Sequence, residues 1–195
     1  TQWKTVEVNG EDVEIPLKWD FKDLGSIAKL EKGSNLTRKE AIKGAVPVIA
    51  GGKSPSGYHS VSNRPKDTIT ISASGANAGH VALYREPIFA TDCTTVISQS
   101  NVVQLFVFYT LRHKQNAITS LQQGGAQPHV YASDLIRLTI FLPSYEEQTL
   151  IAKILTTQEE HIASLDKMIA IEEKRLSWLT DELLSGRILV EEVNE

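Results

Sequence analysis

The segment VIAGGKSPSG, residues 48–57, contains Gly-Gly-Lys-Ser directly after an apolar run and could bind phosphate. A nucleotide-binding P-loop requires Gly-x-x-x-x-Gly-Lys-Ser/Thr, followed by a helix whose N-terminal amides hold the phosphates. Here Pro47 occupies the position of the first glycine, and the Pro-Ser-Gly that follows the Lys-Ser pair forms a turn instead of a helix. The sequence therefore excludes a P-loop and predicts a polar loop after a strand. The functional side chains of this loop are Lys53, Ser54 and Tyr58.

Other catalytic patterns are absent from the sequence. Ser72-Ala-Ser74-Gly75 lacks the Gly-x-Ser-x-Gly nucleophile elbow, and the five histidines are dispersed without metal-ligand spacing. Neither the Asp/Asn-Pro-Pro-Tyr/Phe motif of an amino-methyltransferase nor an acid followed by the Glu-x-Lys of a nuclease is found in a suitable context. We expect a non-catalytic chain. The single cysteine, Cys93, is expected to be a buried apolar residue in a reducing compartment.

Basic residues gather in the first part of the chain. Residues 1–143 carry 15 Lys and Arg against 12 Asp and Glu, whereas residues 144–195 carry 5 against 12. The stretch 32–66 holds seven basic residues and one acid, so it is either a surface for a polyanion or an ordinary solvated loop region. The candidate phosphate contacts are Lys32, Arg38, Lys39, Lys43, Lys53 and Ser54.

Two polar loops, GANAGH at 75–80 and SLQQGGAQPHVY at 120–131, combine glycines with amide and imidazole side chains. Glycine allows close backbone approach, and amides can pair bidentately with base edges. Taken singly, each polar residue is better explained as a structural turn residue than as a base contact. The candidate base contacts are Tyr58, Asn77, His80, Gln122 and Gln123.

In residues 1–143, short β-branched runs alternate with turn-forming residues. This pattern predicts a globular domain with mixed α and β structure. The predicted strands are 46–50, 68–73, 80–84, 94–98 and 138–143. One buried helix is expected over 102–119 and a shorter one over 37–43. With the long helix described next, the predicted fold class is α+β.

A long helix is predicted over residues 144–186, before a tail of residues 187–195. Ser144 and Glu147 fit a capping box, in which the serine accepts an amide hydrogen bond and Glu147 reaches back. No Pro or Gly occurs until Gly186, which is placed to end the helix. At 1.5 Å per residue, 40 residues make a rod of about 60 Å.

Apolar residues recur along this helix with the 3.5-residue period of a left-handed coiled coil. Gln158 and Glu172 interrupt the stripe, and such polar residues help to select register and partner. The stripe predicts a partner helix; the alternative is a helix that lies across its own domain. The apolar members are Ile151, Leu155, Ile162, Leu165, Ile169, Leu176, Leu179 and Leu183.

The segment GGAQPHVYASDLIRLTIFLPSYEEQTLIAKIL, followed by the heptad helix and LLSGRI, resembles specificity subunits of type I restriction–modification systems. It is similar to the end of a target-recognition domain that continues into the family's conserved helix. The N-terminal EIPLKWDFKDLGSIAKLEKGS resembles the start of such a domain. The resemblance covers about residues 14–190.

The resemblance implies roles for several residues. Gly124, Gln127 and Tyr131 would shape the loop before the last strand, whereas Pro143, Glu147 and Gln148 would mark the start of the conserved helix and Leu184, Ser185 and Gly186 its end. An intact subunit of the family has two recognition domains and two antiparallel helices. This chain has one of each, so it is either a natural half-length protein or a fragment. We expect a homodimer joined through antiparallel helices on a palindromic site.

The function implied by the resemblance is recognition of one half of a bipartite double-stranded DNA site. Methyltransferase (M) subunits would supply S-adenosylmethionine and the chemistry, and motor nuclease (R) subunits would join them. We expect no cofactor in this chain, no membrane association and a cytoplasmic location. The alternative is a coiled-coil protein-interaction adaptor without a DNA role.

Overall fold

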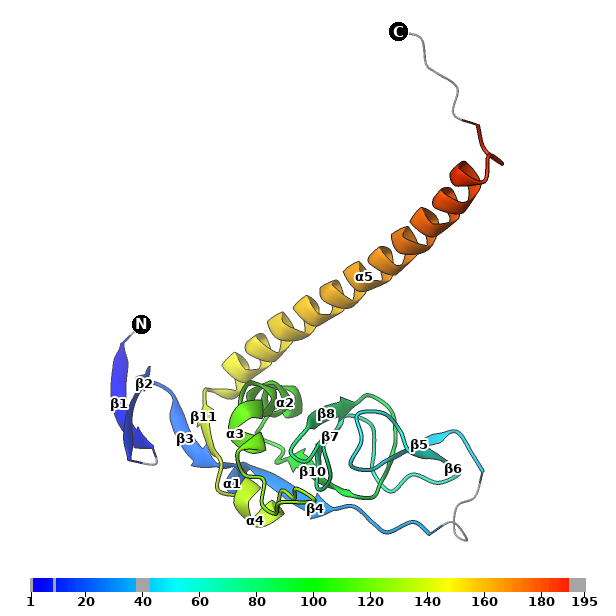
Figure 1. Cartoon of the computed structure of the whole chain (residues 1–195). Coiled ribbons are helices and arrows are strands. Elements are labelled where there is room, and N and C mark those ends of the chain that lie inside the picture. The colour runs from blue at the N-terminus through cyan, green and yellow to red at the C-terminus, as the bar shows by residue number, and fades with distance from the viewer. Residues whose placement is uncertain (1, 9, 38–42, 190–195) are drawn as a thin grey trace. The chain divides into compact units, whose positions relative to one another are not determined.

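The computed structural model describes residues 2–8, 10–37 and 43–189. The chain divides into a first compact unit that extends to Ala152 and a second unit from Lys153 onward. A long helix, α5 (Tyr145–Leu184), begins in the first unit and continues into the second (Figure 1). The fold is α+β, as predicted. Most of the predicted 37–43 helix, with Arg38 and Lys39, lies outside the described residues.

An antiparallel four-stranded sheet forms the centre of the first unit. Its strands follow the order β4 (Ala28–Lys32), β10 (Cys93–Ser98), β7 (Thr68–Ser72) and β8 (Val81–Tyr84). Every residue of β7 is buried, since the strand is central in the sheet. The predicted strands at 68–73, 80–84 and 94–98 are therefore confirmed.

Smaller sheets surround this centre. One has the order β6 (Gly57–His59), β5 (Val46–Ile49) and β9 (Phe89–Ala90), in which β9 runs parallel to β5. A second pairs β11 (Thr139–Leu142) with β3 (Asp20–Asp23), and a hairpin joins β1 (Trp3–Val8) to β2 (Glu11–Pro16). The short helices are α1 (Leu24–Ile27) and α4 (Ala132–Leu135). The predicted strands at 46–50 and 138–143 correspond to β5 and β11.

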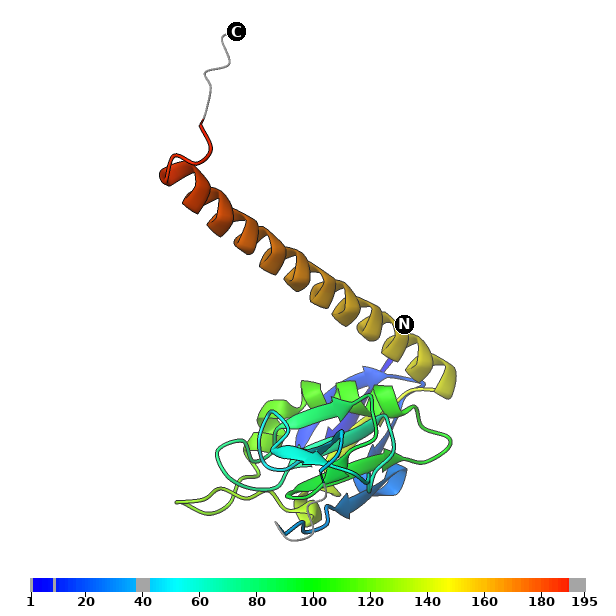
Figure 2. The same cartoon turned by 90° about the vertical axis from the view of Figure 1, so that its right-hand side faces the viewer.

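The predicted helix at 102–119 is two helices, α2 (Gln104–His113) and α3 (Gln115–Thr119). Lys114 breaks the run with φ −86° and ψ 15°, outside the α-helical range of ψ. The side chain of Gln115 accepts from Val81 N–H at 3.1 Å and donates to Gly79 O at 2.8 Å. Helical periodicity does not predict these long-range bonds, which hold Gln115 in place directly after the break. Helix α2 packs on the central sheet, as Figures 1 and 2 show.

The two ends of α5 are capped by its own sequence. At the start, Ser144 Oγ accepts from Glu147 N–H at 3.3 Å, but the Glu147 carboxylate accepts from Trp19 Nε1–H at 3.1 Å. Only the serine half of the predicted capping box is therefore confirmed. The carboxylate of Glu147 is bonded to the indole of Trp19 and does not reach back to the start of the helix. At the end, Gly186 has φ +71°, and Arg187 N–H donates to Glu182 O at 3.0 Å. This is a Schellman motif, which requires a left-handed residue at Gly186.

Gln148 joins the start of α5 to the rest of the first unit. Its side chain is 2% exposed. Nε2 donates to Pro143 O at 2.9 Å, and Oε1 accepts from Val103 N–H at 2.9 Å, just before α2. Ala152, one turn further along α5, is also buried in the main hydrophobic core. The implied helix-start residue Gln148 is thus a buried connector between two helices.

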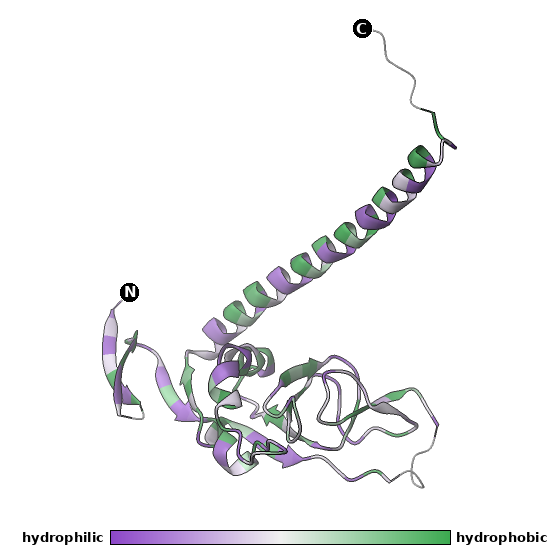
Figure 3. Cartoon of the chain, viewed as in Figure 1, coloured by the Kyte–Doolittle hydropathy of each residue, from purple (hydrophilic) through white to green (hydrophobic). Residues whose placement is uncertain are grey.

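The residues of the predicted apolar stripe of α5 have two different environments. Ile151 is half-buried and packs against the core of the first unit. Farther along, Leu179 is half-buried and the other members are exposed; Figure 3 shows hydrophobic residues recurring along the helix. The exposed members are Leu155, Ile162, Leu165, Ile169, Leu176 and Leu183. The second unit therefore carries exposed apolar side chains at regular intervals along the helix.

Candidate nucleic-acid interface

Three of the loops singled out in the sequence meet in the first unit: residues 50–56, 73–80 and 120–131. Ser72 Oγ, at the end of β7, donates to Gly51 O at 3.0 Å. Gly75 N–H donates to Pro128 O at 3.0 Å, and Val130 N–H donates to Ala73 O at 3.0 Å. Because hydrogen bonds to backbone carbonyls hold the loops together, the three loops form one continuous surface. We call these residues the three-loop surface.

Glycines permit this close approach at two points. A Cβ on Gly51 would lie 2.7 Å from Ser74 O, closer than a real carbon can approach a carbonyl. Gly79 has φ +85°, and its Cα faces the backbone of Ile118 and Thr119 at the end of α3. Since larger residues would push the loops apart, glycine at these positions builds the three-loop surface.

His80, on the three-loop surface, is half-buried and responds to two nearby cations. Burial of the imidazole is the main reason that the pKa of His80 is lowered from its ordinary value of 6.5, and the charges of Lys53 and Arg112 lower it further. Coulombic influence of that kind requires proximity. Lys53 comes from the loop after β5 and Arg112 from the end of α2. The charges of two cations from distant segments therefore both act on His80.

The remaining predicted phosphate residues lie on other segments. Lys53 and Ser54 are both exposed in the loop after β5, whereas Lys32 ends β4 and Lys43 precedes β5. Lys32 and Lys43 are exposed too. Tyr58, on β6, is 61% exposed. The structure thus brings Lys53 together with His80 and spreads the other candidates along the β4 to β6 region.

Three predicted base contacts also hold the loops in shape. Gln122 Nε2 donates to Ala78 O at 2.8 Å, and Gln123 Nε2 donates to Asp134 Oδ2 at 3.0 Å. The carbonyl of Asn77 accepts from His80 N–H at 2.9 Å in a turn. The side-chain bonds give Gln122 and Gln123 the structural role that the sequence left open as an alternative, whereas Asn77 bonds through its backbone. Their contact with bases stays a prediction.

Arg64 belongs to the basic stretch of the sequence but has an internal role. Its guanidinium donates to Thr95 Oγ1 at 2.9 Å, to Asn63 O at 2.8 Å and to Lys32 O at 3.1 Å. It also lies 3.3 Å from the carboxylate of Glu31. The pKa of Glu31 is lowered chiefly by Lys29, with a smaller effect from Arg64. Arg64 therefore ties the edge of β4 to β10.

Sequence reasoning missed Arg112 as a cation that acts on His80. Arg112 lies over the ring of Phe108 at 5.5 Å and shares the C-terminal turn of α2 with His113. The helical period placed it on the buried side of a continuous helix, and only the break at Lys114 moves it to a helix end. The His129 and Tyr131 rings, stacked at 6.1 Å between centroids, add an aromatic pair to the 120–131 loop.

We expect DNA binding to strengthen as the pH falls below about 6.5. The lowered pKa means that His80 is neutral in the free protein at pH 7, and a neighbouring phosphate would favour its protonated form. Affinity for a duplex should rise roughly 3- to 10-fold between pH 7.5 and 5.5, and this gain should disappear in His80→Gln. Fluorescence anisotropy measures it, with His113→Gln as the matched control. An equal pH response in both variants would contradict the placement of His80.

The same shift affects folding stability with a defined sign. Because the folded-state pKa of His80 lies below the ordinary value, the unfolded chain binds the proton more tightly. The contribution of neutral His80 is therefore complete above pH 6.5 and is lost as the pH falls through the folded-state pKa. Binding at low pH must accordingly be measured where the protein is still folded.

The described residues form neither a metal-binding cluster nor a membrane-spanning helix. No cluster of three or more His, Cys, Asp or Glu that could hold a metal ion occurs among them. Within the same part of the chain, no helix is both long and apolar enough to span a membrane.

Comparison with known proteins gives consistent matches. A family model described as the type I restriction modification DNA specificity domain matches residues 16–177. The type I specificity subunit S.MpnORF638P of Mycoplasma pneumoniae is 32% identical over 161 residues, which cover 80% of this chain and 43% of the relative. The specificity subunit of the type I restriction enzyme MjaVIII of Methanocaldococcus jannaschii is 24% identical over 184 residues, covering 89% and 43%.

Solved structures show the same fold. The crystal structure of a type I restriction–modification S subunit from M. genitalium has a TM-score of 0.70 at 25% identity, covering 86% of this chain and 46% of that one. The HsdS subunit from Thermoanaerobacter tengcongensis has a TM-score of 0.64 at 19% identity, covering 89% and 45%. The chain thus spans somewhat less than half the length of the relatives and structures that it matches.

Proposed function

Because the chain belongs to the family of type I restriction–modification DNA specificity domains, we propose that it reads one half of a bipartite DNA site without doing chemistry itself. The observation that carries this proposal is that hydrogen bonds join three polar loops, residues 50–56, 73–80 and 120–131, into the three-loop surface. Cations position a protein on the phosphate backbone, and polar loop side chains then meet base edges. The candidate readers remain Tyr58, Asn77, His80, Gln122 and Gln123.

The exposed stripe of α5 supports a homodimer. Isolated helices are marginal in water, and a helix exposing large apolar residues gains most when a second helix covers them. We define the α5 seam as the predicted stripe, Ile151 to Leu183, including Gln158 and Glu172. A two-fold pair of such seams would present two identical domains to a palindromic site with a spacer.

Charge favours the antiparallel arrangement of this pair. In a parallel pair in register, Glu172 of one copy would face Glu172 of the other inside the seam, and like charges there are costly. In an antiparallel pair, seam residues of one series face those of the other. The alignment that pairs all ten positions places Glu172 opposite Ile162 and Gln158 opposite Leu176. No acidic residue then faces another within the seam.

The helix also carries surfaces for other subunits. A second apolar face, next to the α5 seam, consists of exposed Ile154, Met168, Ile171 and Trp178. The opposite face carries the acidic residues Glu159, Glu160, Asp166 and Glu173. We propose that M subunits, which bring S-adenosylmethionine, dock on this helix and that R subunits join through them. In the alternative function, a protein-interaction adaptor without a DNA role, this apolar face would bind the partner protein.

A salt titration of duplex binding tests the proposal. Lys53→Ala should weaken binding to any duplex alike and reduce the slope of log affinity against log salt by about 0.9, since one phosphate contact is lost. Anisotropy with a 30-base-pair duplex of arbitrary sequence measures this. Lys167→Ala removes the same charge from α5 and should leave the slope unchanged. Affinity independent of salt in the wild type would contradict the DNA role and favour the adaptor.

A further inference from the structure

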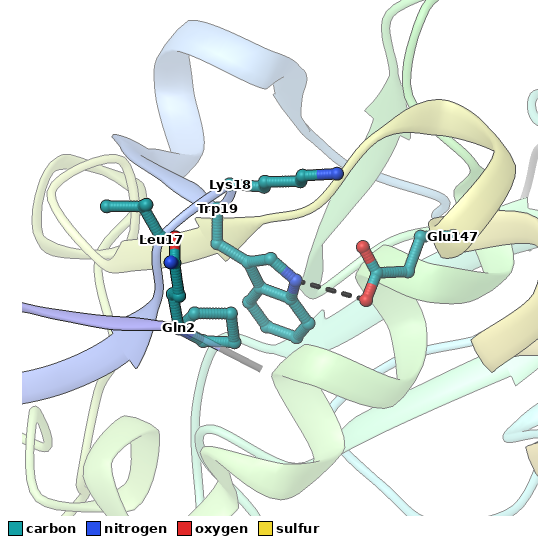
Figure 4. Close-up of a pocket in the computed structure, with 6 residues that line it drawn as sticks. Gln2, Leu17, Lys18, Trp19 and Glu147 are labelled. Carbon is teal, nitrogen blue, oxygen red and sulfur yellow. Dashed lines mark hydrogen bonds between the residues drawn. The ribbon is translucent and has the colours of Figure 1, made fainter.

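A cavity in the first unit opens beside the start of α5. It measures about 460 Å³ and lies between the end of β2 and the first turn of the helix. Figure 4 shows the Trp19 indole pointing toward Glu147, to which its Nε1–H donates at 3.1 Å, with Leu17 on the other side. Leu17 is 47% exposed. The lining residues are Gln2, Pro16, Leu17, Lys18, Trp19 and Glu147. The cavity is thus largely apolar, with a carboxylate at one side.

The segment that follows α5 carries exposed apolar side chains. The Schellman turn at Gly186 redirects the chain, and an ion pair of 2.9 Å between Arg187 Nε and Glu182 Oε1 fixes the turn. Ile188 is then 37% exposed and Leu189 81% exposed. The turn leaves these two side chains in water in a single copy, which costs free energy unless something covers them.

The antiparallel register determines what lies next to this segment. When all ten positions of the α5 seam are paired, Leu183 of one copy faces Ile151 of the other, and Leu155 faces Leu179. In this alignment the last turn of one helix lies beside the first turns of the other, so the segment that starts at Arg187 begins near Glu147 of the second copy. Glu147 borders the cavity, and Arg187 carries the opposite charge. The segment after the turn therefore starts close to the cavity mouth.

We propose that the cavity takes Ile188 and Leu189 of a second copy of this chain, with Arg187 of the second copy beside Glu147. This rests on the proposed antiparallel homodimer and adds to it a contact between each globular unit and the end of the other helix. The contact occurs twice in the pair. It positions each recognition unit relative to both helices, which a coiled-coil seam alone does not do.

The fluorescence of Trp19 reports on the proposed contact. In a variant with Trp3→Phe and Trp178→Phe, Trp19 is the single tryptophan. On dilution through the dimer dissociation range, its emission should shift to longer wavelength as the second copy leaves the cavity. Light scattering on the same samples gives the oligomeric state. Adding Ile188→Ser and Leu189→Ser should abolish the shift and raise the dimer Kd by about 10- to 100-fold.

The controls separate failure of this contact from failure of the dimer. Leu184→Ser makes the same chemical change at an exposed residue outside the α5 seam and should alter neither reading. A dimer whose Trp19 emission is independent of concentration would overturn the cavity contact and leave the dimer intact. A monomer at every concentration would overturn the proposed dimer and, with it, this contact.

Cross-linking provides a second, independent measurement. Leu17→Cys combined with Leu189→Cys should give a covalent dimer under mild oxidation, because the two positions meet across the copies. Leu17→Cys combined with Ile171→Cys should give none. Native Cys93 is fully buried, and burial raises the pKa of its thiol to about 11, so it does not compete. Equal yields from the two pairs would contradict the contact.

Discussion

Ile169→Lys should convert the proposed homodimer into a monomer. In the antiparallel register Ile169 faces Leu165 of the other copy near the two-fold axis, and two-fold symmetry repeats the layer. Ile169 is exposed in the single chain, so the substitution harms the dimer and not the fold of the first unit. Losing two apolar contacts and placing two ammonium groups in the seam costs about 4 kcal/mol or more, a roughly 1,000-fold higher dimer Kd.

Light scattering at micromolar concentration checks this, since the monomer has a mass of 21.5 kDa. Ala170→Lys is the matched control, because it adds the same charge one residue away, on the face opposite the α5 seam. The control should remain dimeric. If both variants stay dimeric, the α5 seam is not the dimer interface; if both dissociate, charge and not packing decides the association.

Gln148→Leu should destabilise the first unit by about 2–5 kcal/mol, lowering its Tm by roughly 5–15 °C. Leucine fits the space of the buried side chain but offers no polar atoms. The Val103 N–H and the Pro143 carbonyl would lose the partners that they have at 2.9 Å, around a side chain that is 2% exposed. A buried donor or acceptor left without a partner costs far more than an average hydrogen bond contributes.

Thermal unfolding followed by circular dichroism measures this loss. Gln158→Leu makes the same exchange on the same helix at an exposed position, and it should leave the first unit unchanged or stabilise the dimer by making its seam more apolar. A Tm of Gln148→Leu within about 2 °C of the wild type would show that the two hydrogen bonds contribute little to stability.

The sequence predicted those features that depend on short-range pattern. The span of α5 follows from a serine cap, a 3.5-residue apolar period and a glycine at the end, and the structure has the helix from Tyr145 to Leu184. The central strands follow from β-branched runs between turn formers. The type of site proposed here is also a prediction from sequence, because loops rich in Lys, Asn, Gln and Gly bear groups that suit DNA; contact of these loops with DNA stays a prediction.

Long-range contacts changed the roles of individual residues. Glu147 fitted a capping box in sequence, yet it accepts a hydrogen bond from Trp19, 128 residues away. Arg64 counted as one more cation in a basic stretch, yet its donors are taken by Thr95, Asn63 and Lys32. Lys114 sits inside a helical period, yet it breaks the helix. In each case a partner distant in the chain outweighs the local preference.

The amino-acid sequence by itself determined the elements, the family resemblance and the chemistry that the loops can offer, because periodicity, capping and turn formation act over a few residues. Only the tertiary structure decided that loops 50–56, 73–80 and 120–131 share one surface, since hydrogen bonds to backbone carbonyls of distant segments bring them together. It also decided which polar groups are engaged inside the domain, because a buried polar group must find a partner wherever the fold supplies one.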